Sequence, residues 1–374
     1  IEYSEFLINY QGGFVRRGLI GEVLYQFYSF SAYPIIPVIS CISYVAFFFV
    51  IIYFFHKFRK YNYSWWILLS PLFLGYTNDI VRKDYLLYCV LIGIITLLRY
   101  SDTGIIKRIF ACVLITFGLF MHEAFIFWGF PIYALILNAK QYHKILNWIL
   151  ICIPLIQFGV LCLFKGTPEI AQHIADSWNS VNPGKALYSG MPSAIGAIGW
   201  NAQDTFIMHL KYNFAVAEGG YGFILLPMII LAAYYMFTNF FFVFDKNPRH
   251  NTFDDKLALS LLYSLLVICM IPMFTVLSCD TGRNMQYLSV GTFAAFVIIP
   301  NKSIISSFPI WYKMGIIKIN NYLDRILQPR RGVLIFMLLL LAISPYHLKF
   351  STCWEQSVVG TLFSYIFKCV EHIF

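Results

Sequence analysis

The sequence predicts an all-α protein that crosses a lipid membrane many times. Of its 374 residues, 59% are hydrophobic and only 12% are charged, and the mean hydropathy is +0.69. Soluble domains carry about 25% charged residues, so this chain has too little charge to cover a water-facing surface. Long apolar runs recur along the chain with polar or basic segments between them. Together these observations predict a polytopic membrane protein with one transmembrane domain over residues 1–374.

Ten apolar runs are candidates for membrane spans, since a spanning helix takes about 20 residues. They cover residues 35–55, 65–77, 85–98, 109–121, 124–137, 145–164, 221–244, 257–277, 285–300 and 332–346. The runs at 65–77 and 109–121 are short, which predicts broken or tilted helices beside a polar cavity. The chain begins at Ile1 with neither a methionine nor a signal-peptide pattern. We therefore expect an eleventh span to precede Ile1.

The charge distribution predicts the orientation of these spans. If residues 1–34 lie outside, the inner loops hold 17 of the 27 basic residues and 5 of the 18 acidic ones. The inner side then carries +12 and the outer side −3, as the positive-inside rule requires. The overall charge of +9 is thus explained by membrane topology, and we expect no nucleic-acid partner.

Three segments are expected to lie outside the bilayer core on the outer side. Residues 165–220 form one large loop of mixed polarity, and loops this long usually bind or cover ligands. Residues 354–374 place apolar side chains on one helical face, and this pattern predicts an interfacial helix. A second such stripe covers residues 19–27.

Ionisable residues beside membrane spans are costly and therefore mark candidate sites. Four clusters fall at the predicted outer ends of spans, namely residues 12–18, 78–84, 121–123 and 279–284. In the first, glycines bracket Arg16 and Arg17, which suits close binding of a phosphate or pyrophosphate. The alternative is an arginine pair that anchors an interfacial helix to lipid phosphate.

The second cluster holds Asp79 and Arg82 at a spacing of three, which permits an ion pair in one wall of a polar cavity or simply at a hairpin tip. In the third, His122 and Glu123 sit between two apolar runs. Desolvation there would raise the pKa of Glu123 and suit it to proton transfer. The alternative is a helix-connecting pair that neighbouring backbone groups satisfy.

The fourth cluster holds Asp280 and Arg283, which could present a carboxylate to a sugar hydroxyl and a guanidinium to a phosphate, or could close a hairpin. The sequence has no P-loop, dinucleotide fingerprint, catalytic Ser-His-Asp motif or metal-ligand spacing. We therefore expect no cofactor and no metal. The absence of these motifs favours a substrate that arrives already activated. A polyprenyl-phosphate-linked or diphosphate-linked sugar is such a substrate. Its phosphates would pair with arginines, and its glycan would stack on Trp178 and Trp200.

With these features the chain resembles the Wzy-type O-antigen and capsule polymerases and the wider GT-C glycosyltransferases of bacteria. The resemblance rests on many spans, richness in Phe, Tyr and Ile, one large loop in mid-chain, and arginines and acids on the outer face. In GT-C enzymes the first outer loop supplies a catalytic acid, which would map onto Glu2 or Glu5, and a juxtamembrane helix, which would map onto residues 19–27. The polymerases use outer arginines, here Arg16, Arg17, Arg82 and Arg283. Their second outer loop is rich in arginine, whereas residues 165–220 contain lysines and no arginine.

The resemblance implies a metal-independent enzyme of the bacterial inner membrane with its site facing the periplasm. Its reaction would polymerise polyprenyl-diphosphate-linked repeat units, with membrane lipid and a chain-length regulator protein as further partners. A GT-C transferase that uses a polyprenyl-phosphate sugar is the first alternative. A transporter or flippase is the second, although the charges lie at outer span ends and no internal repeat is visible.

Overall fold

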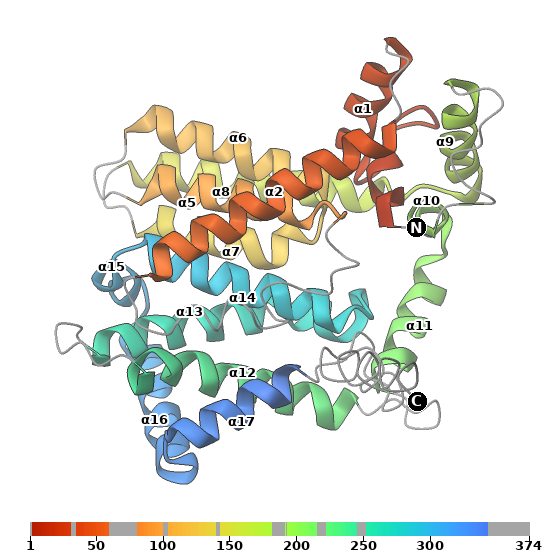
Figure 1. The fold of residues 1–374 in the computed structure, drawn as a ribbon. Helices are drawn as coiled ribbons and strands as arrows, with labels where there is room; N and C mark the ends of the chain where they lie inside the picture. The colour runs from red at the N-terminus through yellow and green to blue at the C-terminus, as the bar shows by residue number, and fades with distance from the viewer. Residues whose placement is uncertain are drawn as a thin grey trace, which may run out of the picture. The chain divides into compact units, whose positions relative to one another are not determined.

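The computed structural model describes residues 2–30, 35–59, 81–99, 104–139, 143–181, 191, 193–214, 222–244 and 252–342. Throughout these residues the regular structure is helical, as the sequence predicted, and no strand occurs (Figure 1). The chain forms two compact units. The first comprises residues 1–52 and 77–204, and the second comprises residues 53–76 and 205–374.

The first unit is built on a group of apolar helices. They are α2 (Ile35–Phe58, which continues into the second unit), α5 (Asp84–Leu98), α6 (Ile105–Met121), α7 (Phe125–Asn138) and α8 (Lys144–Leu163). Helices α5 to α8 pack side by side (Figure 1). Trp128 of α7 is buried at their centre against the rings of Tyr88 and Phe125. Helices α2 and α8 also expose large apolar side chains, among them Phe48, Ile52, Ile149 and Ile156.

A smaller helical layer joins one end of this group. It contains η1 (Glu2–Leu7), α1 (Gly18–Phe30), α9 (Pro168–Val181), α10 (Ser193–Gly196) and η3 (Ala197–Gly199). Trp178 of α9 is its central residue, completely buried between Tyr25 and Tyr28 of α1. The indole N–H of Trp178 donates to the carbonyl of Leu7 at 2.6 Å. This single side chain thus ties the N-terminal segment to a helix about 170 positions later.

The second unit contains the remaining helices. They are the C-terminal part of α11 (Ala202–Phe214), α12 (Gly222–Phe244), α13 (Thr252–Pro272) with its π-helical extension η5 (Met273–Leu277), α14 (Thr281–Ile298), α15 (Asn301–Ser306), α16 (Ile310–Leu327) and α17 (Arg331–Ala342). Helix α13 packs against α12 and α14, and α17 packs along α12.

Helix α16 differs from its neighbours because it is anchored by polar contacts. Asn320 accepts from the hydroxyl of Tyr234 at 2.5 Å and donates to Ser260 at 3.0 Å. Lys256 donates to Asp324 at 2.6 Å. In Figure 1, α16 runs across the direction of α12 and α13. An amphipathic helix held in this way is typical of the membrane interface.

Four of the described helices are long and apolar enough to cross a membrane, namely Ile35–Phe58, Lys144–Leu163, Gly222–Asn239 and Phe253–Leu277. Shorter apolar helices, such as Asp84–Leu98, accompany them. In the most apolar 18-residue stretch of α2, only 28% is buried within the protein, and the same value holds for α8. Apolar surface on this scale is unfavourable in water but is expected where lipid covers it. These apolar helices are those of a membrane-associated protein.

The predicted apolar runs fall on helices where the structure describes them, and four of these helices are long and apolar enough to be candidate spans. The run at 65–77 and the expected interfacial helix at 354–374 lie outside the described residues. The expected large loop at 165–220 is largely helical where it is described, because α9, α10, η3 and part of α11 fall within it. The stripe at 19–27 lies on helix α1, which exposes Val23 and Phe27.

Candidate functional site

The candidate site lies in the first unit, where the loop before α1 meets the turn between α6 and α7. Arg16 and Arg17 come from the loop, and Glu123 comes from the turn. The Arg17 side chain donates from Nε to Glu123 Oε2 at 2.8 Å and from Nη2 to Oε1 at 2.6 Å. Arg16 Nη1 donates to the same Oε1 at 3.2 Å. Two guanidinium groups therefore converge on one carboxylate.

The three side chains are shielded from solvent to different degrees. The Glu123 side chain is 15% exposed, whereas Arg17 is 24% and Arg16 is 32% exposed. Because one carboxylate faces two guanidiniums, the cluster carries a net charge of +1. Arg16 uses Nη1 for this ion pair, and a guanidinium has five N–H donors in all. The cluster is thus suited to receive a further anion on its more exposed side.

The backbone of the arginine loop is held in an unusual conformation. Arg17 has φ +67°, a left-handed value that is uncommon for a residue with a side chain and that often marks functional sites. The carbonyl of Arg17 accepts from Lys83 Nζ at 2.7 Å, and the amide of Arg16 donates to the carbonyl of Phe164 at 3.1 Å. Contacts from α5 and from the end of α8 therefore fix both arginines.

Lys83 is a site residue that the sequence reasoning did not select. It belongs to the predicted cluster at residues 78–84, yet only Asp79 and Arg82 of that cluster were assigned roles. Its side chain is completely buried, and its ammonium group lies 6.0 Å from the ring centroid of Phe6. A buried ammonium requires compensating contacts, and the Arg17 carbonyl provides one. Its place in a charged cluster directly before the apolar helix α5 is the sequence feature that could have indicated a role for Lys83.

The glycines around the arginines serve the fold of the loop. A Cβ at Gly12 would lie 2.6 Å from the carbonyl oxygen of Ile170, so this position packs directly on α9. Gly13 has φ +118°, which side-chain-bearing residues rarely adopt. From the sequence we expect these glycines to bend around a ligand. In the structure Gly12 instead brings the loop against α9, and Gly13 supplies a positive φ in the turn before the arginines.

The expectation that desolvation raises the pKa of Glu123 is wrong. Burial does act in that direction, but the charges of Arg17, His122 and Arg16 and the hydrogen bond from Arg17 hold the pKa of Glu123 well below its usual range. Glu123 is therefore ionised at neutral pH and is a weak base. Its carboxylate can orient the two arginines, whereas proton transfer is better assigned to another group.

His122 is buried beside this carboxylate and is also engaged locally. Its Nδ1 accepts from the backbone N–H of Ala124 at 3.1 Å and lies 3.7 Å from Glu123 Oε2. Nδ1 is thus occupied by a hydrogen bond within the turn itself. His122 therefore shapes the turn that presents Glu123.

An aromatic surface adjoins the arginine pair. Phe14 packs against Tyr10 and Phe164, with ring centroids 5.2 and 5.0 Å apart, and against Phe120 at 6.3 Å. Phe14 and Phe164 remain exposed, as does Leu163 at the end of α8. The arginines therefore lie beside an apolar surface formed by Phe14 and by the exposed end of α8, a helix long and apolar enough to cross a membrane.

The other predicted site residues are placed differently. Glu5 is buried in η1, and Asp79 lies outside the described residues. Arg82 precedes α5 and is partly exposed. Trp178 is completely buried with its N–H bonded, which contradicts its expected role as an open stacking surface, whereas Trp200 is 53% exposed.

Asp280 and Arg283 belong to the second unit. Asp280 precedes α14, and the guanidinium of Arg283 lies 5.7 Å from the ring centroid of Tyr287. The preceding π-helical turn η5 is held by side-chain amides. Asn213 donates to the carbonyls of Thr275 and Ser278 at 3.0 and 2.9 Å. Turns of this kind are frequent at functional sites.

Among the described residues, no group of three His, Cys, Asp or Glu side chains is placed to hold a metal ion. Comparison with known proteins found no matching family model, no similar curated protein and no similar solved structure.

Proposed function

We propose that this protein is a membrane glycosyltransferase that polymerises polyprenyl-diphosphate-linked repeat units into O-antigen or capsular polysaccharide. In this proposal it acts at the periplasmic face of a bacterial inner membrane. The observation that carries the proposal is the convergence of Arg16 and Arg17 on Glu123 at the end of lipid-facing apolar helices. A diphosphate on a long isoprenoid chain has matching chemistry, because its charges require arginines and its tail requires an apolar surface.

The proposed chemistry is a displacement at the anomeric carbon of the donor sugar. The bond from that carbon to the diphosphate oxygen breaks, and the diphosphate leaves with the electron pair while Arg16 and Arg17 stabilise its charge. A hydroxyl of the acceptor glycan forms the new bond and loses its proton. Of the carboxylates predicted from the sequence in the first unit, Asp79 and Glu5 are the candidates for the base. Glu123 is a weak base because the arginines hold its pKa well below the usual range.

A GT-C transferase that uses a polyprenyl-monophosphate sugar is the second candidate. It is favoured by α1, an amphipathic helix that directly follows the arginines and exposes Val23 and Phe27. Helix α1 has the position in the chain at which GT-C enzymes carry a juxtamembrane helix. A monophosphate needs fewer cationic partners than a diphosphate, so the arginine pair favours the polymerase.

The test is analysis of surface glycan in the host after deletion of the gene and complementation with variants. A polymerase predicts that deletion and Arg17→Ala both remove the long-chain ladder and leave a single repeat unit. Lys211→Ala, a charge change on exposed α11, is the matched control and retains the ladder. A ladder of normal length but altered mass would identify the decorating transferase. An unchanged ladder in the deletion strain would contradict both.

A further inference from the structure

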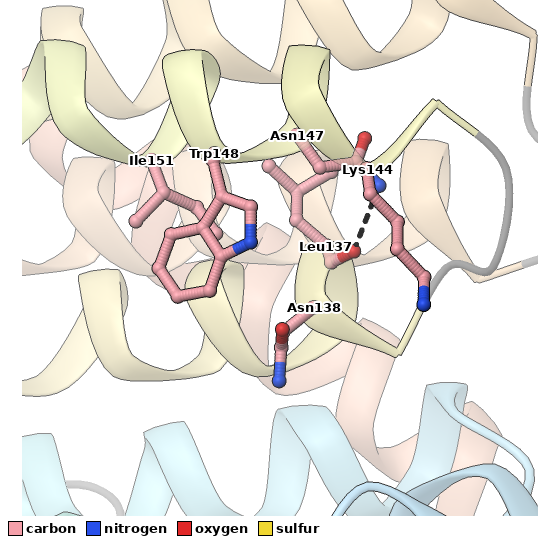
Figure 2. Close-up of a pocket in the computed structure, with 6 residues that line it drawn as sticks. All are labelled: Leu137, Asn138, Lys144, Asn147, Trp148 and Ile151. Carbon is pink, nitrogen blue, oxygen red and sulfur yellow. Dashed lines mark hydrogen bonds between the residues drawn. The ribbon is translucent and has the colours of Figure 1, made fainter.

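The first unit contains a pocket of about 200 Å³ that the proposed function does not use. It lies where the C-terminal turn of α7 meets the first turns of α8. It is lined by Leu137, Asn138, Lys144, Asn147, Trp148 and Ile151. Figure 2 shows the Trp148 indole, the Asn138 amide and the Lys144 side chain around this opening. Three of the four α8 residues (Lys144, Trp148 and Ile151) recur at helical spacing on one face of α8.

Two linked, buried hydrogen bonds fix the wall behind the opening. Asn147 donates from Nδ2 to the carbonyl of Leu137 at 3.1 Å, which Figure 2 marks as a dashed line. Its Oδ1 accepts from Arg108 Nη1 at 3.0 Å. Both Asn147 and Arg108 are almost completely buried. The pocket is therefore preformed, with a second cation directly behind Asn147.

The lining combines a positive charge with apolar surface. Lys144 is exposed at the opening, and the lining residues include no Asp or Glu. Trp148 is 58% exposed, and Ile145 and Ile149 beside it are also exposed on α8. Helix α8 is one of the helices able to cross a membrane. The pocket thus opens at the boundary between a polar rim and a lipid-facing helix.

We infer that this pocket binds an acidic phospholipid of the leaflet that the charge distribution predicts to be cytoplasmic. The lipid phosphate would pair with Lys144, the headgroup hydroxyls would bond the Asn138 amide, and an acyl chain would lie along Trp148 and Ile151. Basic pockets between membrane helices on the cytoplasmic side bind anionic headgroups, and tryptophan favours the interface. The inference does not depend on the proposed glycosyltransferase function.

Native mass spectrometry of the purified full chain in detergent tests this inference. The protein is titrated with phosphatidylglycerol, with phosphatidylcholine and with inorganic phosphate. We expect tighter binding of phosphatidylglycerol than of phosphatidylcholine, and no competition by inorganic phosphate at equal concentration. Lys144→Gln should weaken phosphatidylglycerol binding about fivefold, the effect of one lysine near an anionic lipid surface. Trp148→Leu should weaken it as well.

Lys57→Gln, which removes the same charge at the end of α2, is the matched control and should bind like the wild type. Lys144→Arg keeps the charge and should also retain binding, and circular dichroism checks that every variant is folded. Unchanged phosphatidylglycerol binding by folded Lys144→Gln would overturn the inference. So would equal binding of the two lipids by the wild type, or displacement of the lipid by inorganic phosphate, which would indicate a site for free anions.

Discussion

Glu123 illustrates how a single residue changes its chemical role with its surroundings. By itself, a carboxyl group beside a membrane span is expected to hold a proton more tightly. In the structure the bidentate contact with Arg17 and the additional contact with Arg16 outweigh this desolvation. Glu123 is consequently a fixed anion that sets the positions of two cations, and the cations are the groups available to a substrate.

This assignment predicts how stability depends on pH. Because the folded-state pKa of Glu123 is lowered, its contribution is fully present above the unfolded value of about 4.3 and is lost as the pH falls through the folded value. Glu123→Gln should cost about 1–3 kcal/mol at pH 7, because it leaves two partly buried guanidiniums without their carboxylate. The measurement is the apparent Tm in detergent at pH 7 and at pH 2, because the contribution is lost only below the unfolded value of about 4.3.

The wild type should lose more stability than Glu123→Gln between these two pH values. Asp176→Asn changes an exposed carboxyl group on α9 and is the matched control, which should follow the wild type. If Glu123→Gln kept the wild-type Tm at pH 7, the ion pair would not stabilise the loop as described.

At the scale of elements, the arginine loop depends on how closely α1 approaches η1. The contact is made at Gly21, where an added Cβ would overlap the carbonyl oxygen of Ile8 and lie 2.8 Å from that of Phe6. Both neighbours are backbone atoms, which cannot move aside as a flexible side chain can. The closeness of the two elements, and hence the position of Arg17, therefore requires glycine at this site.

Gly21→Ala should destabilise the first unit by about 1–3 kcal/mol, because overpacking forces the backbone to shift. Gly93→Ala on α5 is the matched control, since its added Cβ would meet only Leu114 Cδ1 at an ordinary 3.6 Å. Alanine is also the better helix former, so this control should be neutral or slightly stabilising. Thermal unfolding of both variants in detergent provides the comparison. Equal Tm values would contradict the close α1–η1 contact.

For the whole molecule, the division of charge predicts one orientation in the membrane. The loops assigned to the inner side carry +12 and those assigned to the outer side carry −3. Alkaline phosphatase should therefore be active when fused after Asn201 and inactive when fused after Ser307. Green fluorescent protein should show the opposite pattern at the same two positions. A reversal of both reporters would place the arginine pair on the cytoplasmic side and remove the proposed periplasmic site.

Much of the helical architecture could be predicted from the sequence. In lipid the backbone must satisfy its hydrogen bonds within each segment, so apolar runs such as 145–164 and 221–244 become helices, here α8 and α12. Arg16, Arg17 and Glu123 could also be selected from the sequence as candidate site residues, because charge next to apolar runs is costly. The role of Trp178 was not, since a tryptophan in a long polar segment has the same local pattern whether it is buried or exposed.

The sequence by itself determined the class of protein, the helical segments and the residues worth examining, because hydropathy and charge act locally along the chain. Only the tertiary structure decided which of those residues meet. Arg17 and Glu123 are 106 positions apart, and their contact at 2.6 Å follows from the packing of α1, α6 and α8 around them. That packing reversed the expected pKa of Glu123 and brought the buried Lys83 into the site. Electrostatic interactions depend on distance in space, and sequence separation does not report that distance.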